Sequence, residues 1–242
     1  VCDLLTDKDK EYEAVMLLGM TTDTQDVSGT VLSRQEVTAS EDAVKTVITS
    51  FEGEYMQIPP MYSALKVNGQ KLCDLARKGI EVERKARPVT IHKIEILEID
   101  LPRVRMKVEC SKGTYIRTLC QDIGEKLGCG ACMESLLRTR VSEFRLDGAL
   151  RLQQIEELVQ REDFSFVQSV DSVFMQYDSA QVMEIAKKMV ENGNRIPKEM
   201  ICNMCQEKEQ KCIRLYDWEN RFIGLYAYMP QEQDFKPIKL FI

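Results

Sequence analysis

The pattern of apolar and polar positions predicts alternating strands and helices over the first 160 residues. Residues 12–19 form an apolar run typical of a buried strand, and a polar loop at 21–29 leads into a second strand near 30–37. Ser40 is a favourable N-cap residue, and apolar residues follow it at helical spacing. Further helices are expected over 71–78, from 114 to 127 and over 153–161.

Two adjacent segments, 88–99 and 104–110, have the alternation of paired strands joined by a short turn. In the first segment we expect Val89, Ile91 and Lys93 to share one face. His92 then lies on the other face. We interpret this single histidine as a structural residue rather than a metal ligand.

The expected secondary structure changes after about residue 175. A helix is expected over 179–191, followed by short strands near 211–216, 222–228 and 237–241. The predicted fold class is therefore α/β, or α+β in the stricter sense: a mixed, mostly antiparallel sheet with packed helices, then a small β-rich domain. The predicted domains are residues 1–175 and 176–242.

The distribution of charge along the chain indicates what kind of partner the protein binds. The net charge of −6 over 242 residues argues at first against a nucleic-acid partner. Residues 57–117, however, carry 13 basic and 7 acidic side chains, whereas residues 1–56 carry 4 basic and 12 acidic ones. A basic middle between acidic flanks is typical of a local anion-binding surface, although a solvated lysine-rich face would look the same.

Nine cysteines without an apolar signal segment favour free thiols in a reducing cytoplasm. No apolar run approaches the length of a membrane span. Of the two Cys-x-x-Cys pairs, Cys202 and Cys205 with nearby Cys212 are the better candidate for a structural metal, but we assign no metal ligand.

Three constellations carry candidate chemistry, one of which is the segment 9–12 with a tyrosine at the entry of the first strand, where a half-buried strand tyrosine is the structural alternative. The proline-fixed loop at 57–69 presents Tyr62, Ser63 and Lys66, which suit base stacking and phosphate contact. The strand-to-helix junction at 110–118 presents Tyr115 and Arg117, beside helix N–H groups that could bind an anion. A hydrophobic turn and a surface arginine are the corresponding structural alternatives.

The order and spacing of several motifs closely resemble the TruB family of tRNA pseudouridine synthases. The motifs lie at 9–12, 22–29, 57–69, 75–79, 87–88, 111–118, 124–131 and 136–142. The resemblance implies isomerisation of uridine 55 in the T loop of tRNA by base flipping, without a cofactor. It also implies a cytoplasmic protein with no membrane partner, expected to be a monomer, and a C-terminal domain similar to the PUA RNA-binding domain.

The resemblance further implies roles for individual residues. Tyr12 matches the active-site tyrosine, Arg117 the basic residue that pairs with the catalytic aspartate, and Leu136 the apolar residue that lines the pocket. The residues expected to contact RNA are Tyr62, Ser63, Lys66, Arg87, Lys112, Tyr115 and Arg138. Thr139 departs from the family pattern, in which consecutive arginines follow the leucine.

A second departure concerns the nucleophile. The family's catalytic aspartate belongs to a Gly-x-Leu-Asp-Pro-like segment, which this sequence lacks and which would lie before Val1. Asp23 and Asp26 belong to a different loop near the site. We therefore expect the chain alone to be inactive, and the alternative function is an RNA-binding or RNA-folding fragment without catalysis. A general interaction protein is the third hypothesis.

Overall fold

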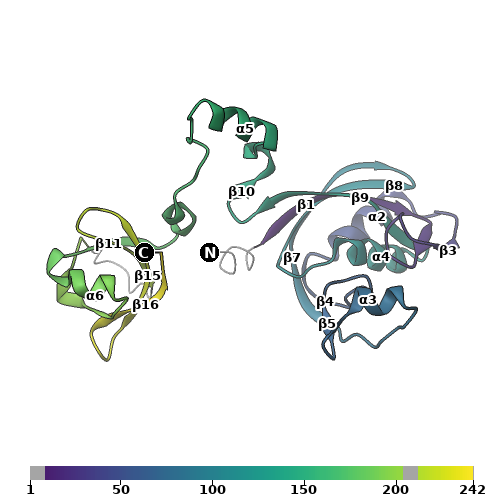
Figure 1. Ribbon diagram of the computed structural model, residues 1–242. Helices are drawn as coiled ribbons and strands as arrows, with labels where there is room; N and C mark the ends of the chain where they lie inside the picture. The colour runs from purple at the N-terminus through teal and green to yellow at the C-terminus, as the bar shows by residue number, and fades with distance from the viewer. Residues whose placement is uncertain (1–8, 204–211, 242) are drawn as a thin grey trace. The chain divides into compact units, whose positions relative to one another are not determined.

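The computed structural model describes residues 9–203 and 212–241 and divides into two compact units, Val1–Ala149 and Leu150–Ile242 (Figure 1). This division falls earlier in the chain than the predicted boundary at residue 175. Each unit has its own hydrophobic cluster and is described separately below.

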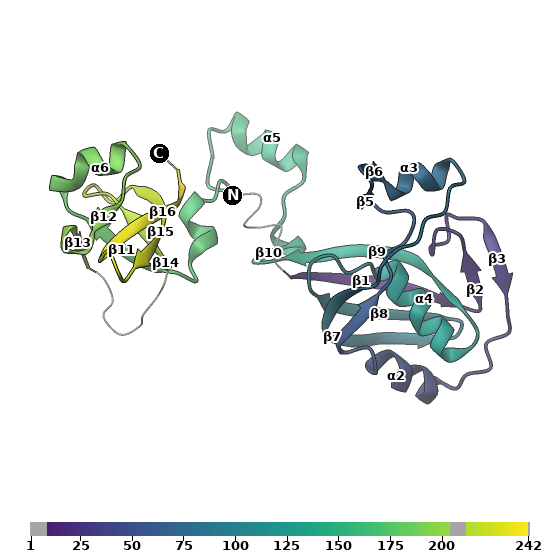
Figure 2. The same cartoon turned by 90° about the horizontal axis from the view of Figure 1, so that it is seen from below.

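A six-stranded antiparallel sheet organises the first unit. Its strand order is β10 (Phe144–Arg145), β9 (Ala131–Val141), β1 (Lys10–Leu18), β8 (Arg103–Cys110), β7 (Arg87–Asp100) and β4 (Gly53–Gln57). Helices α2 (Glu41–Thr49) and α4 (Ile116–Leu127) pack against the sheet (Figure 2). Two short hairpins extend from it: β2 (Met20–Thr22) with β3 (Val31–Arg34), and β5 (Lys66–Val67) with β6 (Gln70–Lys71), followed by α3 (Leu72–Arg77).

Alternation along the central strand separates the core from the solvent. Ala14, Met16 and Leu18 of β1 are buried against the helix side. On the other face Arg105 pairs with both Glu13 and Glu98, at 3.2 Å from each. The sheet therefore buries one face and solvates the other, as an antiparallel sheet can.

Local sequence signals set the ends of the helices. The Ser40 hydroxyl accepts a hydrogen bond from the Ala43 amide, so Ser40 is the N-cap of α2 as predicted. Gly128 ends α4 with a φ of 77°, in the left-handed region that favours glycine.

The predicted faces of β7 are wrong from Lys93 to Leu97, whereas a second register shift between Ile96 and Glu98 returns Ile99 to the core side as predicted. A bulge between Ile91 and Lys93 shifts the register against β8, so Lys93 does not share the buried face of Val89 and Ile91. Ile94 is buried instead. His92 lies at the bulge with its Nε2 3.3 Å from an Asp9 carboxylate oxygen, which agrees with a structural role.

The second unit has a mixed six-stranded sheet. The strand order is β12 (Ile196–Pro197), β16 (Asp234–Leu240), β15 (Phe222–Met229), β14 (Cys212–Tyr216), β11 (Asp178–Val182) and β13 (Ile201–Cys202), in which β11 and β14 are parallel. The helix predicted over 179–191 is wrong in its first half, because β11 occupies it. Only α6 (Lys187–Glu191) is α-helical there. The mixed, mostly antiparallel fold with a β-rich C-terminal part is confirmed.

Aromatic packing ties the end of the segment between 150 and 175 to the second unit. Phe174, at the end of the 3₁₀ segment Val170–Phe174, is buried against Phe222 and Phe241 at ring distances of 6.1 and 5.7 Å. The Tyr216 hydroxyl also donates to an Asp171 carboxylate oxygen at 2.6 Å. Both contacts fix the connecting segment to the second sheet.

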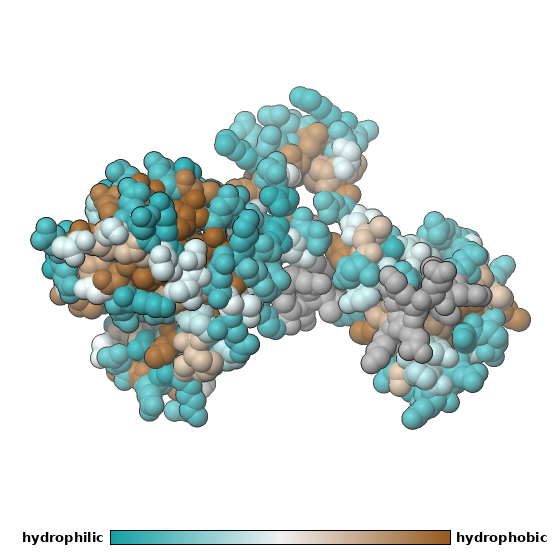
Figure 3. Space-filling view, turned by 180° about the vertical axis from the view of Figure 1, so that it is seen from behind, coloured by the Kyte–Doolittle hydropathy of each residue, from teal (hydrophilic) through white to brown (hydrophobic). Residues whose placement is uncertain are grey.

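Helix α5 (Leu152–Gln160) has no buried residue, and its apolar side chains lie on the surface at the top of Figure 3. Leu152 is 86% exposed. Among the described helices, none combines the length and hydrophobicity that a membrane span requires.

Candidate active site

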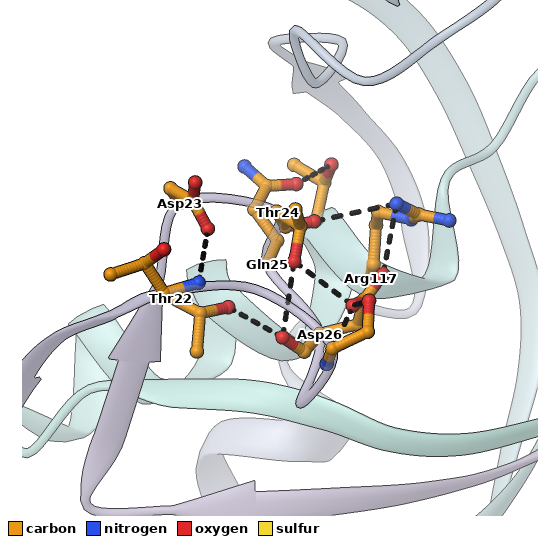
Figure 4. A network of polar contacts seen from close by, with 9 residues as sticks. Thr22, Asp23, Thr24, Gln25, Asp26 and Arg117 are labelled. Atoms are coloured by element: carbon orange, nitrogen blue, oxygen red, sulfur yellow. Dashed lines mark hydrogen bonds and ion pairs between the residues drawn. The ribbon is translucent and has the colours of Figure 1, made fainter. Parts of the chain in front are cut away.

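The loop between β2 and β3 is folded around the Asp26 carboxylate (Figure 4). One carboxylate oxygen, Oδ1, accepts hydrogen bonds from the Thr24 hydroxyl at 2.9 Å, from the Ser28 amide at 3.0 Å and from the Ser28 hydroxyl. The Thr22 hydroxyl donates to the Asp26 carbonyl at 2.7 Å. These bonds close a tight polar loop and leave the second carboxylate oxygen, Oδ2, for a partner outside it.

That partner is Arg117, in the first turn of α4. Its Nη1 lies 3.0 Å from Asp26 Oδ2 and 3.4 Å from the Thr24 carbonyl oxygen. The next residue of the helix, Thr118, donates its hydroxyl to the Gln25 side-chain carbonyl at 2.7 Å. Two neighbouring residues of the loop therefore bind two neighbouring residues of the helix, which fixes the direction of the arginine.

The electrostatics of this pair favour the charged forms. Burial alone would raise the pKa of Asp26, but hydrogen bonds from Ser28 and Thr24 and the charge of Arg117 outweigh it, so the pKa lies below its ordinary value. The Asp26 side chain is 14% exposed and the Arg117 side chain 30% exposed. The pair is therefore ionised at neutral pH and partly open to solvent.

Gln57 holds the start of α4 in place. This buried side chain accepts a hydrogen bond from the Tyr115 amide at 2.8 Å, and its own amide donates to the Tyr115 carbonyl at 3.1 Å. The Tyr115 N–H is therefore not available to an external anion, and the predicted anion binding at this helix start could involve only the amides that follow it. Gln57 connects the rigid 57–69 loop with the helix that carries Arg117.

Tyr12 and Leu136 lie on neighbouring strands. Tyr12 pairs with Arg138 in the register of β1 with β9, and Ala14 pairs with Leu136. Side chains two residues apart on a strand share a face, so these residues share the helix side of the sheet. Burial and then the neighbouring Cys110 raise the pKa of Tyr12, while a hydrogen bond from Arg138 acts in the opposite direction.

The polar loop, α4 and β9 converge on this part of the sheet. The Val27 amide donates to the Met133 carbonyl, and the Met133 amide donates to the Gln25 carbonyl, both at 3.0 Å. Helix α4 packs on both β1 and β9. The elements that carry Tyr12, Leu136 and Arg117 are thus in mutual contact.

The predicted RNA-contacting residues differ in exposure. Lys66, Arg87, Lys112 and Arg138 are exposed, and Tyr62 and Tyr115 are partly buried. Ser63 is only 5% exposed, and its hydroxyl has no hydrogen-bond partner among the described residues. The Ser63 hydroxyl is therefore not accessible in this structure, and its contact with RNA stays a prediction.

A cavity of about 560 Å³ adjoins the loop–helix contact. Gln25 and Thr118 form one side of it, and Tyr55, Arg84 and Asp122 line the remainder. Burial and then the neighbouring Glu125 raise the pKa of Asp122 to about 7. This carboxyl is therefore the one described aspartate in the cavity wall that titrates near neutral pH.

The cysteines give no metal cluster within residues 9–203 and 212–241. Cys129 and Cys132 are buried free thiols. The predicted candidate of Cys202, Cys205 and Cys212 includes Cys205, which lies outside the described residues.

Sequence reasoning missed three residues of this region. Asp26 was placed near the site but not against Arg117, and neither Gln57 nor Asp122 was singled out. Asp26 had a signal, because an aspartate followed two residues later by serine favours a side-chain turn. The role of Gln57 depends on a partner 58 residues away, and local spacing carries no such information.

Comparison with known proteins identifies two family models that match the chain. Residues 1–116 match the model of the TruB family pseudouridylate synthase N-terminal domain, and residues 117–180 match the tRNA pseudouridylate synthase B C-terminal domain. The tRNA pseudouridine synthase B of Lachnoclostridium phytofermentans is 48% identical over 256 residues, which cover all of this chain and 82% of the relative. That of Alkaliphilus oremlandii is 43% identical, covering 99% of this chain and 79% of the relative.

Solved structures support the fold alone. A chain in the crystal structure of a Cbf5–Nop10–Gar1 complex superposes with a TM-score of 0.68 at 23% identity, covering 99% of this chain and 68% of that chain. A chain in the structure of an H/ACA RNP bound to a substrate RNA gives a TM-score of 0.66 at 20% identity, with the same two coverages. From its family-model matches and its relatives, this chain belongs to the TruB family of pseudouridylate synthases.

Proposed function

We propose that the protein is a tRNA pseudouridine synthase that isomerises uridine 55 in the T loop of tRNA. The observation that carries the proposal is that Tyr12, Arg117 and Leu136 lie on β1, α4 and β9, which pack together. Relatives named tRNA pseudouridine synthase B cover nearly the whole chain at 43–48% identity.

The reaction breaks the bond between the ribose C1′ and N1 of uracil and forms a bond between C1′ and C5. N1 gains a proton and C5 loses one, so no oxidant or reductant is needed. The target base must first leave its stack, and Tyr12 offers a ring against which the flipped uracil can stack. Leu136 excludes water from the base.

Arg117 supplies the charge that orders a carboxylate at the glycosidic bond. The nucleophilic aspartate of the family is expected in a Gly-x-Leu-Asp-Pro segment, and Asp26 is not in such a context. Asp26 instead acts as a positioning residue, because it holds Arg117 at 3.0 Å through the ionised pair. The guanidinium keeps other donor groups for the nucleophile.

The tRNA contacts are assigned to the exposed cations of the basic middle segment. Lys66, Arg87 and Lys112 are exposed there and suit phosphate contact, and the partly buried Tyr62 and Tyr115 suit contact with unstacked bases. The β-rich part of the chain, residues 176–242, is assigned as a PUA-like RNA-binding domain. We expect the protein to act as a monomer in the cytoplasm, where free thiols are stable.

Tritium release from tRNA labelled at uridine C5 tests the activity in the complete protein. The wild type should release tritium, and Tyr12→Phe should stop the release while leaving tRNA binding on filters unchanged. Full activity of Tyr12→Phe would show that the reaction does not need the Tyr12 phenol. Binding by the wild type without any release would favour the alternative of a non-catalytic RNA-binding protein, which these relatives do not support.

A further inference from the structure

We propose that Arg138 is a positioning residue for Tyr12: its guanidinium donates a hydrogen bond to the phenol oxygen and holds the ring in the orientation that the reaction needs. This role differs from the phosphate contact expected from the sequence. It rests on the proposed function, because it concerns the tyrosine of the same active site.

The register of the two strands makes this contact possible. Tyr12 of β1 is the direct neighbour of Arg138 on β9, and directly opposed side chains lie close enough to interact. The pairing shifts between Glu11 and Tyr12, so that Glu11 opposes Arg140 and Thr139 is the extra residue of a bulge. Because of this extra residue, Arg138 and Arg140 each lie opposite a residue of β1. The Thr139 hydroxyl donates a hydrogen bond to a Glu11 carboxylate oxygen at 2.7 Å.

Arg138 also differs in charge balance from its neighbours on the sheet. Arg140, Arg105 and Arg103 each pair with a carboxylate, at distances between 2.5 and 3.2 Å. None of the ion pairs of the described residues involves Arg138, and on the neighbouring strand it stands directly opposite Tyr12. Among residues 9–203 and 212–241, no acid therefore offsets its positive charge, and the side chain opposite it is the tyrosine.

The groups around the Tyr12 phenol affect its pKa in opposite directions. Burial raises the pKa of Tyr12, and Cys110 on β8 raises it further, so both disfavour the phenolate. The hydrogen bond and charge of Arg138 lower the pKa and oppose these effects. A tyrosine that accepts the C5 proton does so at its phenol oxygen, and a cation at that oxygen stabilises the form that accepts it.

The test is a titration of Tyr12 that does not depend on RNA or on turnover. The complete protein is labelled with fluorotyrosine, whose more acidic phenol titrates where the protein stays folded, and Tyr12 is assigned as the ¹⁹F signal missing in Tyr12→Phe. In Arg138→Gln the Tyr12 midpoint should rise by about one pH unit, the low end of the range for loss of a nearby opposite charge. Arg138→Lys should restore part of the shift.

Arg105→Gln is the matched control, since it removes an arginine from the neighbouring strand β8 on the opposite face of the sheet. It should leave the Tyr12 midpoint unchanged. An unchanged midpoint in folded Arg138→Gln would overturn the proposal. In activity assays a positioning role predicts a fall in kcat and an alkaline shift of the pH profile, whereas a rise in KM alone would identify Arg138 as a phosphate contact. Because the titration needs no substrate, its result is separable from failure of the proposed function.

Discussion

The Asp26–Arg117 pair illustrates how single residues prepare the site. Three donors fix one oxygen of Asp26, which leaves the other oxygen to orient Arg117 at 3.0 Å. Arg117 and Tyr12 were predicted from the sequence because their local motifs carry them. The partnership with Asp26 joins residues 91 positions apart and depends on how the loop meets α4, so the motif spacing could not specify it.

Asp122 provides a residue-scale prediction about pH. Its pKa is about 7 in the folded protein, above the ordinary 3.8, so the folded state favours the neutral acid. Stability from this group is therefore present below the ordinary pKa and is lost as pH rises towards 7. Asp122→Asn should raise the free energy of unfolding at pH 8 by about 1–2 kcal/mol and leave it unchanged at pH 4.

Urea unfolding at both pH values measures the difference. Glu83→Gln, at an exposed carboxylate, should change stability little at either pH. An Asp122→Asn variant that is equally stabilised at pH 4 and pH 8 would show that packing, and not ionisation, causes the effect.

At the scale of elements, helices that depend on apolar periodicity and capping residues can be predicted from the sequence. Strand faces that depend on the pairing register cannot. The helix after Ser40 and the helix ending at Gly128 follow from local signals. The bulge at His92 reverses the faces of β7 until a second register shift between Ile96 and Glu98, because one extra residue shifts a period of two. The strand Asp178–Val182 is helical in pattern but pairs in parallel with β14, so tertiary pairing overrides the local preference.

The contact between α4 and the start of β9 gives a prediction at this scale. A Cβ at Gly124 would lie 2.2 Å from the Ala131 amide nitrogen, which is backbone and cannot rotate away. Gly124→Ala should therefore lower the free energy of unfolding by about 1–3 kcal/mol through overpacking. It should also lower activity, because α4 carries Arg117.

Gly148→Ala is the control, since a Cβ there meets nothing within 4 Å. The denaturant midpoints of Gly124→Ala and Gly148→Ala measure the difference in stability between the two variants. Equal midpoints for Gly124→Ala and the wild type would contradict the close approach.

On the scale of the whole molecule, charge distribution explains how an acidic protein can bind RNA. The net charge is −6, yet residues 57–117 have an excess of positive charge. Within this segment the cations differ: Lys66 is an exposed cation on the 57–69 loop, whereas Lys93 lies on β7 with its Nζ 3.8 Å from a Glu95 carboxylate oxygen. We therefore expect local surfaces, and not the total charge, to set RNA affinity.

Lys66→Gln should weaken tRNA binding and reduce the slope of log affinity against log salt by about 0.7–0.9, the amount expected for one lost phosphate contact. Lys93→Gln removes the same charge from the same segment and should leave the slope unchanged. Filter binding over a series of salt concentrations measures both. A slope that falls equally in the two variants would mean that general charge, and not a contact at Lys66, drives binding.

The most direct test of the central claim is to locate the modified nucleotide. The complete protein is incubated with unmodified tRNA, and pseudouridine is detected by carbodiimide treatment and primer extension. We expect one new stop, immediately 3′ to uridine 55 of the T loop, that is lost with Arg117→Ala and with tRNA carrying cytidine at position 55. Binding of tRNA without any stop, or a stop only at another uridine, would contradict it.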